Sequence, residues 1–286
     1  MSDTGAVQER SDVPSRLATT APPVRPRARR RIGSGAARLL RRVAGVVIFV
    51  LIMQVLSVWG PSQWRIPSLD TFVAGVVALV TAPTFLTAVA ETVIAVLIAV
   101  ALATALAIVV GIVFGTSRFI EIAFALPFEL LRPIPAFAVI PLAIIALGSG
   151  QPMEVAVGVF AGWWPLLFNT IYGVRQVDRQ AVDAARVMGC GRLQIAYRVV
   201  LPSLLPFLFA GLRVAMPIVL VVVIGAEYLS TAQRGLGGVL IVATSGGQLS
   251  VLWSTAAVAG VLGILLGGVV ALAGRWAAPW AEERAR

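Results

Sequence analysis

After residue 42 the chain alternates between long apolar segments and short polar ones. Each apolar segment is close to or longer than the roughly 20 residues that a helix needs to cross the hydrocarbon layer of a bilayer. The six segments cover residues 43–58, 87–114, 122–147, 155–172, 207–226 and 251–273. The pattern predicts an all-α membrane protein with six transmembrane helices.

Two features of the spans predict their finer structure. The third span contains Pro133, Pro135 and Pro141, and because proline lacks a backbone N–H we expect it to break into an interfacial piece and a membrane piece. Close helix packing is predicted at three GxxxG pairs, Gly111/Gly115, Gly158/Gly162 and Gly263/Gly267. Outside the spans, residues 62–82 are expected to form an outer loop that lies on the membrane before the second span.

All 23 basic residues are arginines, and they are distributed unevenly. Ten lie in residues 1–42, which are rich in Pro, Ser and Ala and have the composition of a disordered tail. With the N-terminus in the cytoplasm, the six helices place 19 arginines inside and two outside, in agreement with the positive-inside rule. The predicted organisation is a basic cytoplasmic tail over 1–42, a transmembrane domain over 43–275 and a cytoplasmic C-terminal tail over 276–286. Such a tail can also bind anionic lipid or nucleic acid, but before an apolar segment a topology signal is favoured, and no nucleic-acid partner is predicted.

The composition excludes several kinds of catalytic site. Hydrophobic residues make up 59% of the chain and charged residues 13%, an excess that a bilayer explains better than a soluble core does. The sequence has no Lys for a P-loop, no His for an imidazole zinc site or a triad, and a single cysteine, Cys190. We therefore predict no catalytic residue and no metal ligand.

The longest polar stretch between two spans, residues 174–206, has the pattern of two short helices. Asp178 is a good N-cap for a helix over 179–188, and Gly189 suits a left-handed stop. A second helix over 192–199 is expected to end at Leu201–Pro202.

This helical pair lies on the predicted cytoplasmic side, where small alanines permit close approach by a partner. Arg186, Arg192 and Arg198 can each donate paired hydrogen bonds to carboxylates. We expect the element to dock another protein. The alternative is an amphipathic loop that lies on the lipid headgroups.

The same stretch resembles a known motif. Asp183–Ala184–Ala185, Gly189, Val199 and Leu201–Pro202 have the spacing of the EAA loop of ATP-binding-cassette importer permeases. Asp183 stands where that family usually has Glu, and Val199 where it usually has Ile. Further similarity to the nitrate, sulfonate and taurine branch lies at residues 132–135, 140–142, 169–173, 211–213, 226–227 and 235–237. Residues 146–148 lack the Trp-Phe-Gly common in that branch.

The resemblance implies the fold of a type I (MetI-like) importer permease, with both termini in the cytoplasm of a multi-pass inner-membrane protein. It also implies a second copy of the permease, a cytoplasmic ATPase dimer that binds ATP and Mg, and an extracytoplasmic solute-binding protein. The solute would be a small molecule, an anion such as sulfonate, taurine or nitrate. The implied ATPase-coupling residues are Asp183, Ala184, Ala185, Arg186, Gly189, Val199, Leu201 and Pro202.

Polar residues within or next to the spans are candidates for a translocation path or gate, because charges are costly inside a bilayer. The candidates are Arg132, Asn169, Arg213 and Glu227. Glu129 is a possible partner for Arg132, and Arg234 one for Glu227. For Arg132 and Arg213 the alternative is that they anchor their helices at the inner interface.

A different class of protein remains open at this point, namely a secondary transporter or channel driven by an ion gradient. It would need acidic residues inside the membrane, and only Glu91 and Glu227 lie near suitable positions. The helical pair and its motif favour the importer permease.

Overall fold

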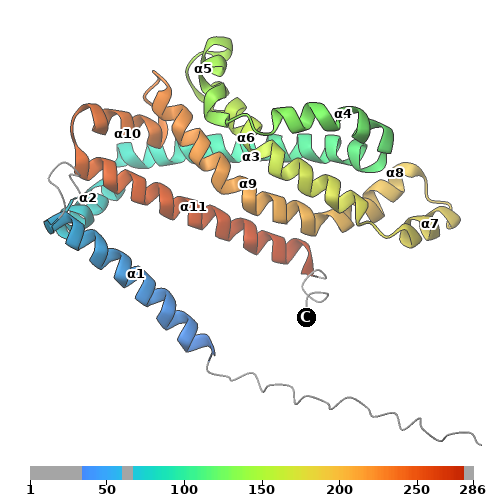
Figure 1. Ribbon diagram of the computed structural model, residues 1–286, viewed down its shortest axis with the longest axis horizontal. Helices are drawn as coiled ribbons and strands as arrows, with labels where there is room; N and C mark the ends of the chain where they lie inside the picture. The colour runs from blue at the N-terminus through green and yellow to red at the C-terminus, as the bar shows by residue number, and fades with distance from the viewer. Residues whose placement is uncertain (1–33, 60–66, 280–286) are drawn as a thin grey trace, which may run out of the picture. The chain divides into compact units, whose positions relative to one another are not determined.

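The computed structural model describes residues 34–59 and 67–279, and every regular element in them is a helix (Figure 1). In chain order the elements are α1 (Ser34–Trp59), α2 (Leu69–Thr81), α3 (Pro83–Thr116), α4 (Arg118–Leu131), α5 (Ala136–Leu147), α6 (Gln151–Arg175), α7 (Arg179–Val187), α8 (Arg192–Ile195), the π-helix η2 (Ala196–Val200), α9 (Leu201–Leu229), α10 (Gly235–Ser245) and α11 (Leu249–Ala277). Most of the predicted N-terminal tail, residues 1–33, and the end of the C-terminal tail lie outside the described residues. Helix α1 begins at Ser34, within the predicted tail.

Among the residues that the structure describes, four helices are long and apolar enough to cross a membrane: α3, the continuous helix Arg192–Leu229, α6 and α11. The pair formed by α4 and α5 makes a fifth if it is counted as one span. These five correspond to the second to sixth predicted spans. The first predicted span, residues 43–58, is helical within α1, and its crossing of the membrane stays a prediction.

The predicted break in the third span is confirmed. Helices α4 and α5 meet at an angle of 90°, with Arg132 to Pro135 between them. Pro133 and Pro135 mark this break, whereas Pro141 lies inside α5 without ending it. A helix therefore starts within the span, at Ala136.

Helix α6 packs along α3 and along α9, and small residues make this close approach possible. A stripe at every fourth position of α3 is completely buried and consists of Ala95, Ala99, Ala103 and Ala107. Gly111 continues the stripe, and a methyl group there would lie 2.6 Å from Cγ2 of Thr170 on α6. A methyl group at Gly162 would likewise lie 2.6 Å from Cγ2 of Val219 on α9. In contrast, a methyl group at Gly267 would have nothing within 4 Å.

We expect Gly111→Ala to lower the thermal unfolding midpoint, since overpacking of this kind costs about 1–3 kcal/mol. Gly267→Ala is the matched control, because it also alters a GxxxG pair but adds its methyl group to open space. The better helix propensity of alanine should leave that variant unchanged or slightly more stable. Tryptophan fluorescence during heating of the detergent-solubilised protein measures the unfolding midpoint of both variants. An equal decrease of the midpoint in the two variants would contradict the packing described here.

Two short apolar helices, α2 and α10, lie in segments that the sequence analysis took for outer loops. Helix α2 packs on α11, where Gly75 approaches Ser254 so closely that a methyl group would lie 2.6 Å from its Oγ. Helix α10 contacts α3, α9 and α11. The bundle therefore carries ordered helices at the end opposite to α7 and α8 (Figure 1).

Candidate functional site

Helix α7 begins and ends at the residues that the sequence predicted. The side chain of Asp178 accepts a hydrogen bond from the backbone N–H of Gln180, at 2.9 Å. At the other end Gly189 has a φ of +79°, its N–H donates to the carbonyl of Arg186, and the N–H of Cys190 donates to the carbonyl of Ala185. This pair of bonds is a Schellman motif, in which a left-handed residue closes the helix.

The segment from α7 through Gly189 and α8 to η2, which we call the docking element, carries large apolar side chains that no other described residue covers. These side chains and their exposed fractions are Val187 (88%), Met188 (76%), Leu193 (83%) and Tyr197 (71%). Ala185 and Ile195 are buried and hold the element in place. Arg186 pairs with Asp183 at 3.0 Å, and both side chains are about two-thirds exposed. An exposed apolar patch with charges at its edge is typical of a docking surface.

A cavity of about 830 Å³ lies between this element and the C-terminal ends of α3 and α6. Its lining is strongly basic, with one carboxylate, and the charged members are Arg175, Arg179, Asp183, Arg186 and Arg192. Four arginines of this region thus line the cavity, and one of them, Arg186, is also largely exposed to solvent.

The predicted end of the second helix is wrong. Leu201 and Pro202 do not terminate it, because the chain runs from α8 through η2 into α9 as one helix of 38 residues, Arg192–Leu229. Pro202 occupies the first turn of α9 and has no N–H to donate to the preceding turn. The wider turn of the π-helix just before it accommodates this missing bond.

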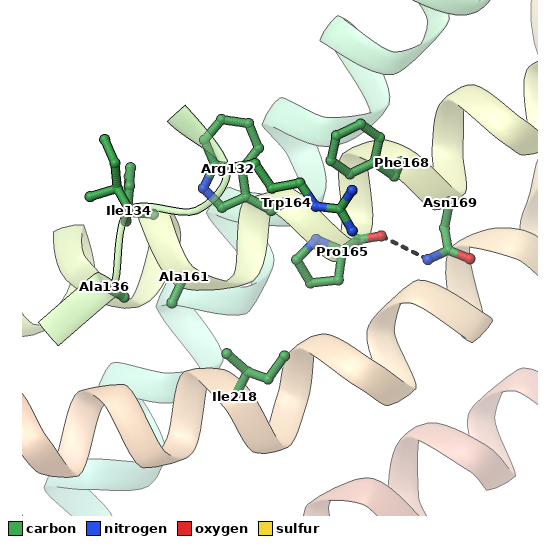
Figure 2. Close-up of a pocket in the computed structure, with 10 residues that line it drawn as sticks. Arg132, Ile134, Ala136, Ala161, Trp164, Pro165, Phe168, Asn169 and Ile218 are labelled. Atoms are coloured by element: carbon green, nitrogen blue, oxygen red, sulfur yellow. Dashed lines mark hydrogen bonds between the residues drawn. The ribbon is translucent and has the colours of Figure 1, made fainter. Parts of the chain in front are cut away.

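A second site lies where α4 and α5 meet against α6 and α9 (Figure 2). A cavity of about 480 Å³ opens there. Two of the four predicted path residues, Arg132 and Asn169, line it together with Trp164, Pro165 and Phe168. Asn169 donates a hydrogen bond to the carbonyl of Pro165 at 2.8 Å.

The surroundings of Arg132 differ from those predicted. Its guanidinium lies 4.9 Å from the centre of the Phe168 ring in a cation–π contact, and in the described part of the chain no ion pair joins it to Glu129. Figure 2 shows the guanidinium between Phe168 and Pro165. Both residues belong to the second half of α6, and the alternative that Arg132 anchors its helix at the inner interface stays a prediction.

Arg213 lies elsewhere. It lines a cavity of about 290 Å³ between α9 and α11, near the start of α9 and the end of α11. The structure therefore does not bring it together with Arg132 and Asn169. The alternative that it anchors α9 near the inner interface stays a prediction.

Glu227, the fourth candidate, is fully buried at the C-terminal end of α9 (1% exposed). It accepts hydrogen bonds from the hydroxyl of Thr92, at 2.8 Å, and from the backbone N–H of Gly237, at 2.9 Å. The hydroxyl oxygen of Thr92 in turn accepts the N–H of Leu236. A carboxylate and a hydroxyl from α9 and α3 thus bind the first turn of α10.

The predicted pairing of Arg234 with Glu227 is wrong, since Arg234 pairs with Glu91 of α3 at 3.1 Å. Glu91 also accepts the N–H of Gly235 at 3.0 Å. All three side chains that bind the start of α10 therefore come from α3 or α9. We call Glu91, Thr92 and Glu227 the outer clamp.

Sequence analysis overlooked Glu154, which lies in the first turn of α6 and is only 3% exposed. Its Oε1 has no hydrogen-bond partner among the described residues. Its place at the predicted border of a span made it look like an ordinary loop residue. A signal was available, because an acidic residue in the first turn of an apolar helix is favoured by the helix dipole.

Comparison with known proteins decides the family. A family model described as "Binding-protein-dependent transport system inner membrane component" matches residues 103–282, well over half of the chain. The protein belongs to this family. It is thus an inner-membrane, multi-pass permease component of an ABC transporter, a class of transport subunits rather than of enzymes.

Several permeases are similar in sequence. The bicarbonate transport system permease protein CmpB of Synechococcus elongatus is 33% identical over 149 residues, covering 52% of this permease and 54% of CmpB. The nitrate import permease protein NrtB of Leptolyngbya laminosa is 30% identical over 143 residues, covering 50% and 51%. The matched region of the permease spans about half the length of these relatives.

Solved structures agree on the fold. The permease superimposes on a chain of a bacterial ABC transporter that imports the acidic polysaccharide alginate, with a TM-score of 0.59 and 14% identity. The match covers 84% of the permease and 94% of that chain. The predicted MetI-like fold of an importer permease is therefore confirmed.

Proposed function

We propose that this permease is the transmembrane subunit of an ATP-driven importer that moves a small anion into the cytoplasm by alternating access. The single observation that carries the proposal is the exposed helical element α7–Gly189–α8. Its apolar patch of Val187, Met188, Leu193 and Tyr197 lies on a polar loop and has no cover within the described residues. The patch suits a protein partner, which we propose to be a cytoplasmic ATPase dimer that binds ATP and Mg.

The proposed coupling path follows one continuous helix. Arg192–Leu229 starts in the docking element and ends at the outer clamp, and at 1.5 Å per residue its 38 residues are about 57 Å long. A rigid helix of this length can carry a movement of the loop to the opposite end of the bundle. The outer clamp ties that end to α3 and α10. Closure of the ATPase dimer would thereby change the outer opening.

The remaining parts of the proposed machine are a second copy of the permease and an extracytoplasmic solute-binding protein. A solved relative of the same fold was crystallised with an alginate-bound periplasmic protein, which supports a partner of this kind. We further propose six membrane spans, with α1 as the first and with both termini in the cytoplasm. The arginine distribution supports this orientation.

The proposed solute is a small anion. The relatives named above are bicarbonate and nitrate permeases, and both solutes are small planar oxyanions. Sulfonate and taurine remain candidates of the same branch.

Reconstitution into proteoliposomes with the ATPase and the binding protein tests the proposal. We expect uptake of labelled nitrate or bicarbonate to require ATP on the cytoplasmic face and the binding protein on the other, and to persist when proton and sodium gradients are collapsed. The buried carboxylates Glu154 and Glu227 are the observation that favours a gradient-driven transporter instead. Uptake that follows the ion gradient and ignores ATP would establish that alternative.

A further inference from the structure

We propose that the cavity at the break between α4 and α5 binds a small planar oxyanion, with Arg132 as its main ligand and Trp164 as a second donor. This inference rests on the proposed function and places an anion site within the path. The cavity volume, about 480 Å³, lies within the range of about 300–1,000 Å³ that is usual for ligand sites.

The charge of Arg132 within an apolar span favours a binding site. Arg132 lies in the predicted third span, contacts Phe168, and lines the cavity together with Trp164 and Pro165 of the membrane-spanning helix α6. A charged side chain within an apolar span is costly, so arginines found there usually face a pathway or a binding site. Irregular backbone is likewise tolerated inside a membrane only where it lines a cavity or is buried, and Arg132 and Ile134 of the break line this one.

An excess of unused donors is the second argument. No Asp or Glu lines the cavity. Trp164 is 7% exposed, and its indole N–H has no acceptor among the described residues. Figure 2 shows this nitrogen on the Ile134 side of the ring, towards the break. Donors without acceptors around a positive charge favour an anion.

Preorganisation is the third argument. The Phe168 ring fixes one face of the Arg132 guanidinium by a cation–π contact at 4.9 Å, which leaves the N–H groups in its plane available. A planar guanidinium donates two parallel hydrogen bonds to a planar oxyanion, and a spherical halide cannot accept them in the same way. Asn169 is held by its bond to Pro165 and keeps its second amide N–H for the cavity.

The test uses the full-length permease in lipid nanodiscs, with ¹⁵N-nitrate and ¹³C-bicarbonate as probes and exchange line broadening as the readout. We expect Arg132→Gln to weaken binding of both anions at least tenfold, and Arg132→Lys to weaken it less. Trp164→Phe should weaken binding about threefold to tenfold while keeping the ring in place. Chloride should compete poorly with either anion.

Trp163→Phe is the matched control, since Trp163 also has an indole N–H without a partner but does not line the cavity. Its affinity should equal that of the native protein. The proposal is overturned if native permease does not broaden the anion signals, or if Arg132→Gln and Trp164→Phe bind as the native protein does. These titrations use the permease without an ATPase. If the proposed coupling to an ATPase is wrong, anion binding is therefore unchanged, so the two proposals fail in different experiments.

Discussion

Replacement of Glu227 with Leu is expected to release the start of α10 from α3 and α9. The substitution removes the acceptor for the buried N–H of Gly237 and one acceptor of the Thr92 hydroxyl, which can still donate to the carbonyl of Ala88 at 3.2 Å. A buried donor left without an acceptor costs about 1–3 kcal/mol. We therefore expect a stability loss of about 1–3 kcal/mol and at least tenfold faster amide hydrogen exchange at residues 235–240.

Glu227→Gln provides the comparison for this prediction. The amide keeps one oxygen as an acceptor and nearly the same volume, so less than half of the loss is expected. Hydrogen exchange of the permease in lipid, followed peptide by peptide, measures both variants. Unchanged exchange of α10 in Glu227→Leu would show that the outer clamp does not hold this helix.

Replacement of Gly189 with Glu is expected to lower ATP-driven uptake more than tenfold. A Cβ atom added at this position meets no atom within 4 Å, so the bundle itself should fold. The φ of +79° is unfavourable for any residue with a Cβ, and this strain disturbs the stop of α7. The new carboxylate would also project beside the exposed Val187 and Met188, where the proposed ATPase docks.

An alanine pair separates the backbone effect from the effect of the charge. A methyl group added at Gly189 or at Gly191 would meet only open space, but Gly191 has an ordinary φ of −68°. Gly189→Ala should therefore reduce uptake severalfold, whereas Gly191→Ala should leave it unchanged. Equal uptake by the two variants in the proteoliposome assay would contradict a role for the left-handed stop.

Local signals predicted much of this structure. Asp178 and Gly189 mark the ends of α7 because capping depends on a few neighbouring residues. Pro133 and Pro135 mark the break between α4 and α5 for the same reason. The apolar segments located the long helices, since each must match the thickness of the bilayer.

Other features depend on contacts between distant parts of the chain and could not be predicted. Glu227 and Thr92 are 135 positions apart, and nothing in the sequence indicates that they meet. Arg234 was assigned to Glu227 because both lie in one loop, whereas its partner Glu91 comes from α3. Similarly, the contact of Arg132 with Phe168 depends on the 90° bend between α4 and α5.

The helix that continues past Leu201 and Pro202 is a different kind of error. Proline usually marks a boundary, but here the wider turn of the π-helix directly before Pro202 accommodates its missing N–H, and the helix continues. The π-helix before it extends the same helix towards the docking element. This continuity is what makes α9 a direct link between the docking element and the outer clamp.

Co-purification from native membranes in mild detergent tests the central claim most directly. The tagged permease should recover a cytoplasmic ATPase in equimolar amount, as measured by quantitative mass spectrometry, and Gly189→Glu should lose it while the amount of folded permease stays the same. Equal recovery of the ATPase with both proteins, or recovery of the native permease alone, would contradict the assignment of α7 and Gly189 as the coupling element.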